Sequence, residues 1–536
     1  MAETAYGTLT PTQVRSGWRG RRWLRVTAPK IVLGLIIILA TFLRFYNLDA
    51  IGDGNTYYTA AVESMLQSWK NFFFVAAEPG GSVTVDKPPL GLWPQAVSAY
   101  FLGVNGFAVA LPQILAGILS VVVIYHLVKR YFGEVTGLLA ALGLAITPVA
   151  IAVERNNTMD ATLTFALLLA AWAFVKAADS GKLRWLLLGA FLVGLGFNIK
   201  MLQAFLPLPA FYALYFLGSQ ERWHRKLLNL VLATALLLLV SFSWAVAVDL
   251  TPASQRPYVG SSENNTVLEL VFGHNGLNRL FGGGGGGAAP QSQPAPPPSQ
   301  QPPGQATPGQ GSGVTAPLGA GGPGGSGEIG EPGLWRLFTT PLSNEIGWLL
   351  PVGLFSTVLL AVSTPLRWPL ADRHKALLLW GGWLLTSVVF FNVAEFYHAY
   401  YLGIIGPPLA ALVAIGVVSL WRLHHRRPIL AWTSLVAVTV GTVAFQVFTA
   451  YQYANSTPWL LIVVVLIAVG IGLLIVNLIN GKQNAARLGA TCLVLAMLVT
   501  PAVWSALTTL EESPHTGLPR VQLLGTTDNS RVRPTR

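Results

Sequence analysis

Residues 15–46 read RSGWRGRRWLRVTAPKIVLGLIIILATFLRFY, a basic segment followed at once by an apolar run. An apolar run of this length can cross the hydrocarbon core of a membrane as a helix. The whole chain has the same character, since 53% of its 536 residues are hydrophobic and 10% are charged, against roughly 25% charged residues in a soluble domain. These values exclude an ordinary water-soluble enzyme and predict an all-α polytopic membrane protein.

Apolar runs of about 20 residues predict thirteen membrane-spanning helices. They lie at 30–46, 107–128, 135–152, 161–177, 185–199, 202–218, 227–248, 346–364, 376–394, 400–420, 429–450, 459–479 and 488–507. The segment 88–103 is also apolar, but it is short for a span, and counting it would move most basic connections to the opposite side. We therefore expect this segment to form a helix that lies on the outer membrane surface.

The basic residues before the first span place the N-terminus in the cytoplasm by the positive-inside rule, and thirteen spans then place the C-terminus outside. With this orientation the cytoplasmic segments carry 22 of the 34 basic residues but 5 of the 22 acidic residues. The formal net charge of +12 therefore reflects membrane orientation, and nucleic acid is not an expected partner. We expect a multi-pass protein of a bacterial plasma membrane.

The sequence divides into a cytoplasmic basic tail at 1–29, a membrane region at 30–281 with an outer loop at 47–106, a glycine- and proline-rich linker at 282–327, a second membrane region at 328–507 and an external tail at 508–536. The linker cannot bury enough apolar surface to become ordered, which predicts disorder. In the outer loop, an apolar stripe from Tyr58 to Trp69 predicts a second interfacial helix.

Ionisable residues collect in the loops that this orientation places outside, whereas the spans hold almost none away from their ends. Ion-coupled transporters usually carry ionisable residues inside their spans. The pattern therefore favours a site at the outer surface. The candidates are Asp53, Glu63, Asp86 and Lys87 in the first outer loop, Arg155 and Asp160 between the third and fourth spans, Lys200 between the fifth and sixth, and His398 between the ninth and tenth.

Two of these candidates are suited to lipid phosphate. Lys87 precedes two prolines that fix the backbone, so its ammonium would be presented at the membrane interface. Arg155 carries the guanidinium that binds phosphate in a bidentate manner. Structural roles are also open for these residues. A lysine at the interface can extend to lipid headgroups without binding a substrate, and Asp160 could simply stabilise the start of a helix.

Each of the remaining candidates could have either a functional or a structural role. Asp53 lies between two glycines just past the first span, where its carboxylate could act as a general base or be solvated in a turn. His398, Tyr400 and Tyr401 could line a sugar or phosphate site, or could belong to the aromatic belt that membrane proteins place at the lipid interface.

Together these motifs resemble the membrane glycosyltransferases of the GT-C architecture, in particular family 39, which includes the protein O-mannosyltransferases and the lipid A aminoarabinose transferase. The resemblance rests on an acidic residue after the first span, on the sequence DKPPL at 86–90, on the spacing of Arg155 and Asp160, and on the histidine and tyrosine run near 398. Residues 57–74 and 256–280 are also similar to a bacterial subgroup of mannosyltransferase-like proteins.

The resemblance implies an enzyme that transfers one sugar from a polyprenyl-phosphate-linked donor to a lipid, glycan or protein acceptor on the outer face, with inversion. It implies Asp53 as the base, Asp160 as a second catalytic carboxylate, and phosphate binding by Lys87, Arg155 and Lys200. Contacts with the substrates are expected from Tyr57, Tyr58, Glu63, His398, Tyr400 and Tyr401. If a divalent metal takes part, Asp86 and His274 are its expected ligands.

Two other functions stay open at this point. A transporter or flippase of lipid-linked sugars would share the topology and the basic interface, but it would form no new glycosidic bond. A structural membrane scaffold would tolerate neutral replacements of Asp53, Lys87 and Asp160.

Overall fold

The computed structural model describes residues 16–277, 326–363, 365, 368, 370–454, 456–510, 519 and 521. In this part of the chain the regular secondary structure is helical, apart from isolated β-bridges between Ala76 and Thr84 and between Val83 and Tyr258. The predicted all-α class is confirmed. The linker predicted at 282–327 and the tail at 508–536 fall almost wholly outside the described residues, so the predicted disorder and the boundaries of these regions stay predictions.

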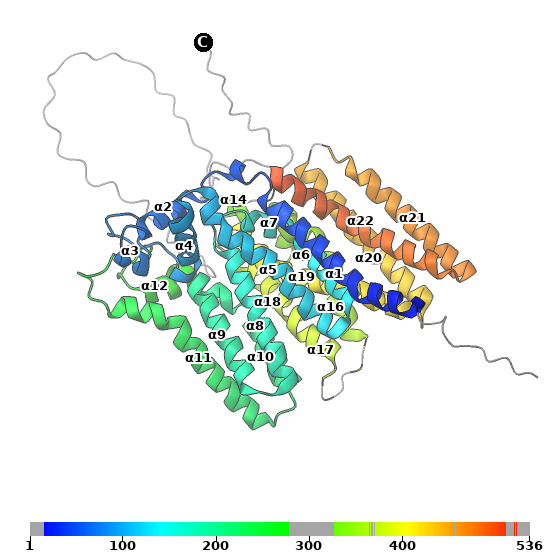
Figure 1. Cartoon of the computed structure of the whole chain (residues 1–536), viewed down its shortest axis with the longest axis horizontal. Coiled ribbons are helices and arrows are strands. Elements are labelled where there is room, and N and C mark those ends of the chain that lie inside the picture. Colours follow the sequence, from blue (N-terminus) through cyan, green and yellow to red (C-terminus); the bar gives the residue numbers. More distant parts are fainter. Residues whose placement is uncertain are drawn as a thin grey trace, which may run out of the picture.

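Most of the described chain forms a bundle of long apolar helices (Figure 1). Eleven helices, counted over the described residues, are long and apolar enough to cross a membrane. Their main segments are α1 (Ser16–Phe45), α5 (Gly106–Phe132), α8 (Asp160–Ser180), α9 (Leu183–Lys200), α11 (Trp223–Leu250), α16 (Leu350–Val362), α18 (Gly382–Val393), α19 (Gly406–His424), α20 (Pro428–Tyr453), α21 (Trp459–Asn480) and α22 (Gln483–Leu510). Each of them overlaps one of the predicted spans.

The other two predicted spans differ from a straight membrane helix. The predicted span at 135–152 is divided into α6 (Glu134–Ala145) and α7 (Pro148–Glu154), which are bent by 61°. Pro148 causes the break, because it cannot donate a hydrogen bond to the preceding turn and it disfavours helical backbone at the residue before it. The span predicted at 202–218 is the turn η3 (Met201–Phe205) followed by α10 (Leu208–Gly218), which is short for a span at 1.5 Å per residue. The count of thirteen and the orientation derived from it therefore stay predictions.

The first outer loop folds into short helices at one end of the bundle, which we call the loop end (Figure 1). These are η1 (Leu48–Ile51), α2 (Thr56–Met65), α3 (Trp69–Phe74), η2 (Pro89–Gly91) and α4 (Trp93–Leu102). In Figure 1, α12 (Val267–Phe272) lies near α3, and η4 (Gly273–Leu277) follows it directly. The interfacial helix predicted in this loop does not run through to Trp69 as a single helix. The reason is that α2 ends at Met65, and Ser68 starts a new helix by accepting a hydrogen bond from the backbone of Asn71.

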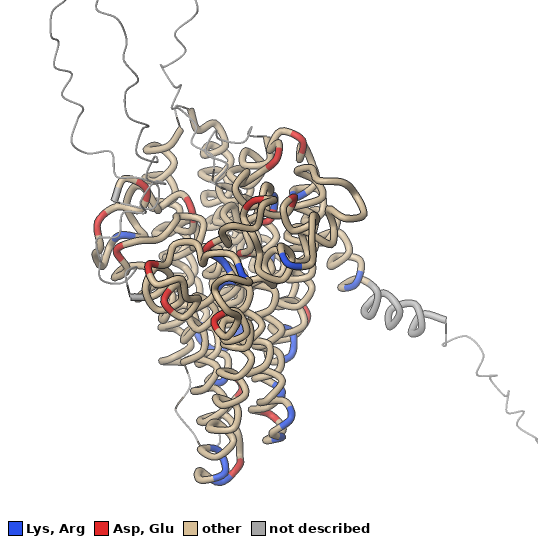
Figure 2. Tube along the Cα trace, turned by 90° about the vertical axis from the view of Figure 1, so that its left-hand side faces the viewer, with Lys and Arg blue, Asp and Glu red and all other residues tan. Residues whose placement is uncertain are grey.

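Charged residues are distributed unevenly along the bundle (Figure 2). Acidic residues are frequent at the loop end, whereas Lys and Arg mark the opposite tips of the helices. For example, α5 starts at the loop end and carries Lys129 and Arg130 in its last turn, and α19 likewise carries Arg422 in its last turn. We call this opposite end the basic end.

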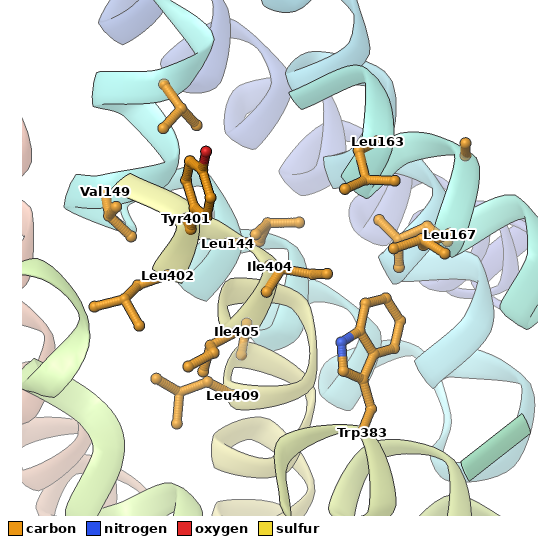
Figure 3. Packing of buried hydrophobic residues seen from close by; sticks show 14 of the residues in the cluster. Leu144, Val149, Leu163, Leu167, Trp383, Tyr401, Leu402, Ile404, Ile405 and Leu409 are labelled. Atoms are coloured by element: carbon orange, nitrogen blue, oxygen red, sulfur yellow. The ribbon is translucent and has the colours of Figure 1, made fainter. Parts of the chain in front are cut away.

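The core of the bundle surrounds the segment from Ala399 to His424, which contains α19, because 89% of the residues in its most apolar part are buried. Leu144 from α6, Leu163 from α8 and Trp383 from α18 pack with apolar side chains at the start of α19 (Figure 3). Gly416 lets α19 approach α16 closely, because a Cβ atom there would lie 1.9 Å from Ser356 Oγ. Close approach at small residues is a general feature of helix packing in membranes. The preceding turn, η8 (Ala399–Ile405), is thereby held at the centre of the molecule.

Candidate functional site

An ion pair between two neighbouring helices lies at the centre of the candidate site. Asp160 is the first residue of α8 and Lys200 is the last residue of α9, and the tight turn at Gly181 makes these helices antiparallel neighbours. Lys200 Nζ donates to both carboxylate oxygens of Asp160 at 2.6 Å, and the two residues are 5% and 2% exposed. Burial of charge is unfavourable unless it is compensated, so each residue of this pair depends on the other.

Aromatic rings from η8 cover this ion pair. Lys200 Nζ lies 3.5 Å from the centre of the Tyr401 ring and 5.0 Å from that of Tyr400. Aromatic faces attract cations, and the attraction is stronger when water is excluded. Figure 3 shows Tyr401 at the edge of the apolar cluster, with its hydroxyl pointing away from Leu402 and Ile404. The core of the bundle thus fixes the rings, and the rings fix the ammonium.

The first outer loop contributes a second ammonium group. Lys87 is buried and forms an ion pair with the neighbouring Asp86. Pro89 starts η2 directly afterwards, so the backbone around Lys87 has little freedom. From η4, the side-chain amide of Asn275 donates to the backbone carbonyl of Asp86 at 3.1 Å, and it connects the segment after α12 to this loop.

The two ammonium groups border one cavity of about 170 Å³. Its lining consists of Lys87, Lys200, Leu202, Gln203, Phe272, Asn275, Gly276, Phe390, Tyr397 and Tyr401. An ammonium group has three donors. Asp160 accepts hydrogen bonds from Lys200 at both of its carboxylate oxygens, so the hydrogen bonds found within the described residues account for two of the three donors. The cavity is therefore suited to an anionic group attached to a small polar molecule.

Two tyrosines of α2 lie near these charges. Burial raises the pKa of Tyr58 well above its usual range, and the negative charges of Asp86 and Asp160 add to the increase. The hydroxyl of Tyr58 is therefore a neutral hydrogen-bond donor at physiological pH. Tyr57 is half exposed, and its ring lies 5.4 Å from that of Tyr58. Tyr57 thus lies at the surface and Tyr58 in the interior, and neither residue lines the cavity.

Comparison with known proteins identifies the family of the chain. A family model described as dolichyl-phosphate-mannose-protein mannosyltransferase matches residues 86–244. YkcB and YycA of Bacillus subtilis (strain 168), mannosyltransferases by name, are 39% and 38% identical over 89% and 88% of this chain, and 74% and 76% of theirs. The chain belongs to the GT-C family 39 glycosyltransferases. It is thus a membrane glycosyltransferase, and the transporter alternative is not favoured.

A solved structure shares the fold of this family 39 chain. The crystal structure of ArnT from Cupriavidus metallidurans bound to undecaprenyl phosphate matches it with a TM-score of 0.51 at 16% identity. The match covers 92% of this chain and 78% of ArnT. At this identity the likeness shows the fold, and the predicted GT-C architecture is confirmed.

In this family 39 chain the residue expected to be the base lies at the surface. Asp53 is exposed, and no hydrogen bond or ion pair of its carboxylate is found within the described ranges. Its backbone carbonyl accepts a hydrogen bond from Thr59 Oγ1 at 2.7 Å, and Asn157 binds the backbone of Asn55 on the other side. The chain thus holds the backbone of Asp53 while its carboxylate faces outward. Glu63 is likewise exposed on α2, outside the lining of the cavity.

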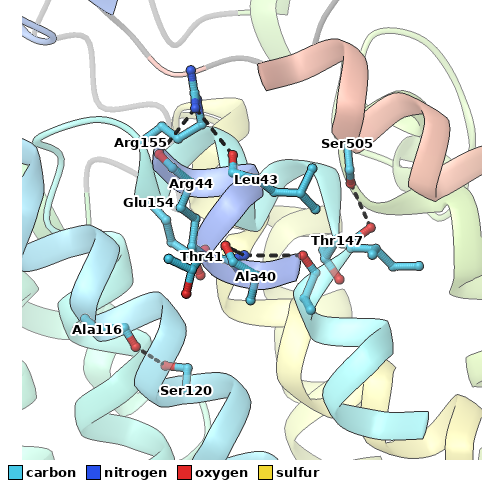
Figure 4. Close-up of polar contacts among 12 residues, drawn as sticks. Ala40, Thr41, Leu43, Arg44, Ala116, Ser120, Thr147, Glu154, Arg155 and Ser505 are labelled. Atoms are coloured by element: carbon cyan, nitrogen blue, oxygen red, sulfur yellow. Dashed lines mark hydrogen bonds and ion pairs between the residues drawn. The ribbon is translucent and has the colours of Figure 1, made fainter. Parts of the chain in front are cut away.

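Arg155 has a structural position instead of the phosphate-binding position predicted for it. Its guanidinium donates to backbone carbonyls of α1 and of the turn that follows, and to that of Thr509 in α22. The last carbonyls of a helix lack partners within the helix, and Arg155 supplies donors for those of α1 (Figure 4). Burial lowers the pKa of Arg155 to about 10, so it stays protonated at neutral pH. Phosphate binding was predicted from the guanidinium group alone. The backbone carbonyls that it binds belong to segments distant in the sequence and could not be predicted.

Next to Arg155 lies a buried ion pair that the sequence did not predict. Arg44, in the last turn of α1, pairs with Glu154 at the end of α7 (Figure 4). Arg44 also donates to the carbonyls of Ala40 and Ala145. A Cβ atom at Gly117 would lie 2.3 Å from the Glu154 side chain, so α5 encloses the pair closely. The sequence contains one indication of this pair, because Arg44 lies inside the apolar run of the first span and a charged residue there requires a partner.

His398 lies beside the cavity-lining tyrosines without lining the cavity itself. Its ring stacks on Tyr400 with the centres 5.3 Å apart, and its Nδ1 atom lies 3.1 Å from Glu328 Oε2. Glu328 also accepts a hydrogen bond from the backbone of Ala399. The role of Glu328 was not predicted, because it follows the low-complexity tract without any helical pattern. The contacts of Glu328 connect the segment that begins at Ser326 to η8.

The donors predicted for a divalent metal, Asp86 and His274, come from two different segments. The carboxylate of Asp86 is bound by Lys87, and His274 lies in η4 on a separate segment. Across the described ranges, no group of three or more His, Cys, Asp or Glu residues is placed to hold a metal ion. A metal bound by Asp86 and His274 therefore stays a prediction, and no step of the proposed reaction is assigned to a metal.

Proposed function

We propose that this enzyme transfers a single sugar from a polyprenyl-phosphate-linked donor to an acceptor on the extracytoplasmic face of a bacterial plasma membrane. The observation that carries the proposal is the cavity at the loop end, bordered by the ammonium groups of Lys87 and Lys200. Its size suits one small polar group, and its position near a membrane surface suits a lipid phosphate. The undecaprenyl phosphate bound to ArnT supports this class of ligand.

The donor phosphate would bind between the two lysines. Charge-assisted hydrogen bonds from ammonium to phosphate are roughly twice as strong as neutral ones. In the reaction, the bond between the anomeric carbon and the phosphate oxygen breaks, and the phosphate leaves with an additional negative charge. Donors already in place at that oxygen stabilise this charge without further reorganisation. Asp160 acts in this proposal as a positioning residue, because it fixes Lys200.

The acceptor would approach from the exposed side, where Asp53 lies. The acceptor oxygen forms the new bond to the anomeric carbon, and its proton passes to the Asp53 carboxylate. One displacement of this kind inverts the configuration at the anomeric carbon. The neutral hydroxyl of Tyr58 and the ring of Tyr401 would contact the sugar between the two ends of the site.

The test is turnover by the purified full-length protein. It would be incubated with polyprenyl-phosphate-linked sugars and with membrane extracts as the source of acceptor, and each donor would be followed by mass spectrometry. We expect consumption of one donor with a new glycosidic product, a large loss in Lys87→Gln, and near-normal turnover in Lys70→Gln, which changes an exposed lysine of the same loop. Absence of turnover with every donor, or movement of donor across a membrane without a new bond, would contradict the proposal.

A further inference from the structure

A second and larger cavity lies at the basic end of the bundle, away from the site of the two lysines. It has a volume of about 570 Å³ and is a groove between α6, α19, α20 and α22. Its walls are apolar and consist mainly of Val135, Leu139, Leu142, Val417, Val418, Leu435, Val494, Leu495 and Leu498. Val135 and Leu495 are exposed on its sides, so the groove faces the surroundings of the bundle. In a membrane protein those surroundings are lipid chains.

The mouth of the groove has the opposite character, because two arginines and two tryptophans border it. Arg422 lies in the last turn of α19 and Arg487 lies near the start of α22, and both are exposed. Arg422 also donates to the Phe132 carbonyl at 2.7 Å, whereas no ion pair of Arg487 is found in the part of the chain that the structure describes. The rings of Trp421 and Trp432 lie 5.9 Å apart beside them. Tryptophan is enriched where a membrane protein meets the headgroup region.

One carboxylate also borders the groove, but its charge is compensated. Glu134 forms an ion pair with Lys129 at 2.5 Å and accepts a hydrogen bond from Tyr125. The net charge at the mouth is therefore positive. The apolar wall is also of suitable length, since residues 487–498 of α22 extend about 16 Å along the helix axis, close to the roughly 15 Å of one leaflet of the hydrocarbon core.

We propose that this groove binds an anionic phospholipid from the leaflet at the basic end. The phosphate would lie at Arg422 and Arg487, and one acyl chain would lie along the apolar walls. Basic pockets between membrane helices on the cytoplasmic side bind the headgroups of anionic lipids by the same combination of contacts. This site is separate from that of the proposed donor, because the groove and the cavity at Lys87 lie at opposite ends of the bundle.

The experiment compares phosphatidylglycerol with phosphatidylcholine of identical acyl chains, added to the full-length protein in detergent and detected by native mass spectrometry. We expect phosphatidylglycerol to be retained more strongly, and Arg487→Gln to lower its affinity about fivefold, the effect of roughly one basic residue near an anionic headgroup. Arg225→Gln is the control, because Arg225 is exposed at the start of α11, outside the groove. Its lipid retention should equal that of the unchanged protein.

A second variant tests the acyl chain. Leu495→Trp fills the groove from a lipid-exposed position and should reduce retention of both lipids. Equal retention of the two lipids by the unchanged protein would overturn the proposal, and so would full phosphatidylglycerol retention by Arg487→Gln. If inorganic phosphate displaced phosphatidylglycerol while Leu495→Trp had no effect, the site would bind only an anion and the proposal would also fail.

Discussion

The buried ion pair of Lys200 and Asp160 allows stability and catalysis to be separated. Both residues are almost completely buried, and the ammonium binds both carboxylate oxygens. Removal of one partner leaves an uncompensated buried charge, which costs about 3–5 kcal/mol, whereas replacement of both partners by uncharged residues is often close to neutral. We therefore expect Lys200→Met and Asp160→Asn each to destabilise the protein by about 3–5 kcal/mol. The double variant should recover most of this loss.

Activity should follow a different pattern in the same three variants. If Lys200 stabilises the leaving phosphate, its loss lowers kcat about 10²- to 10³-fold, the effect of removing one donor at a developing negative charge. The double variant should be stable and still inactive. The assays are detergent-induced unfolding for stability and donor consumption per folded molecule for activity. Full activity in the double variant would refute the phosphate-binding role, and unchanged stability in both single variants would refute the buried ion pair.

Three further variants test other parts of the structure. Asp53→Asn should lower kcat about 10²- to 10⁴-fold if the carboxylate is the base, with normal activity in Asp49→Asn as the control; normal turnover by Asp53→Asn would assign the base elsewhere. Arg155→Met should lower the free energy of unfolding by about 3 kcal/mol or more, because several carbonyls lose a charged donor, with an unchanged KM for the donor among the molecules that fold. Gly416→Val should destabilise by about 1–3 kcal/mol through its clash with α16, whereas Gly441→Ala should not, because nothing lies within 4 Å of its Cβ position.

The helices and several site residues could be predicted from the sequence for simple physical reasons. A membrane helix needs a continuous apolar run, so the long helices are visible in one dimension. Lys87, Asp160 and Lys200 stood out because a charged residue at the end of an apolar run requires an explanation. Asp160 and Lys200 begin and end consecutive spans, so their proximity follows from the antiparallel packing of those spans.

Other features depend on contacts that no local pattern contains. The carbonyls bound by Arg155 belong to residues more than 100 positions away in the sequence. Asn275 lines the cavity from a segment without helical periodicity, so its role could not be predicted, whereas Tyr397 belongs to the histidine and tyrosine run near 398. The bend before α7 is different, because Thr147-Pro148 is a sequence signal for a break. The apolar character of the run at 135–152 concealed that signal.

The proposed reaction depends on Lys87 and Lys200, which hold the phosphate of the polyprenyl-phosphate-linked donor. The most direct test is an experimental structure of the full-length protein with a bound polyprenyl phosphate, supported by binding measurements on Lys87→Gln and Lys70→Gln. We expect phosphate oxygens at about 2.7–2.9 Å from the ammonium nitrogens of both lysines, the range of charge-assisted hydrogen bonds. We also expect weaker binding in Lys87→Gln alone. A phosphate bound elsewhere, with equal affinity in both variants, would contradict this role of the two lysines.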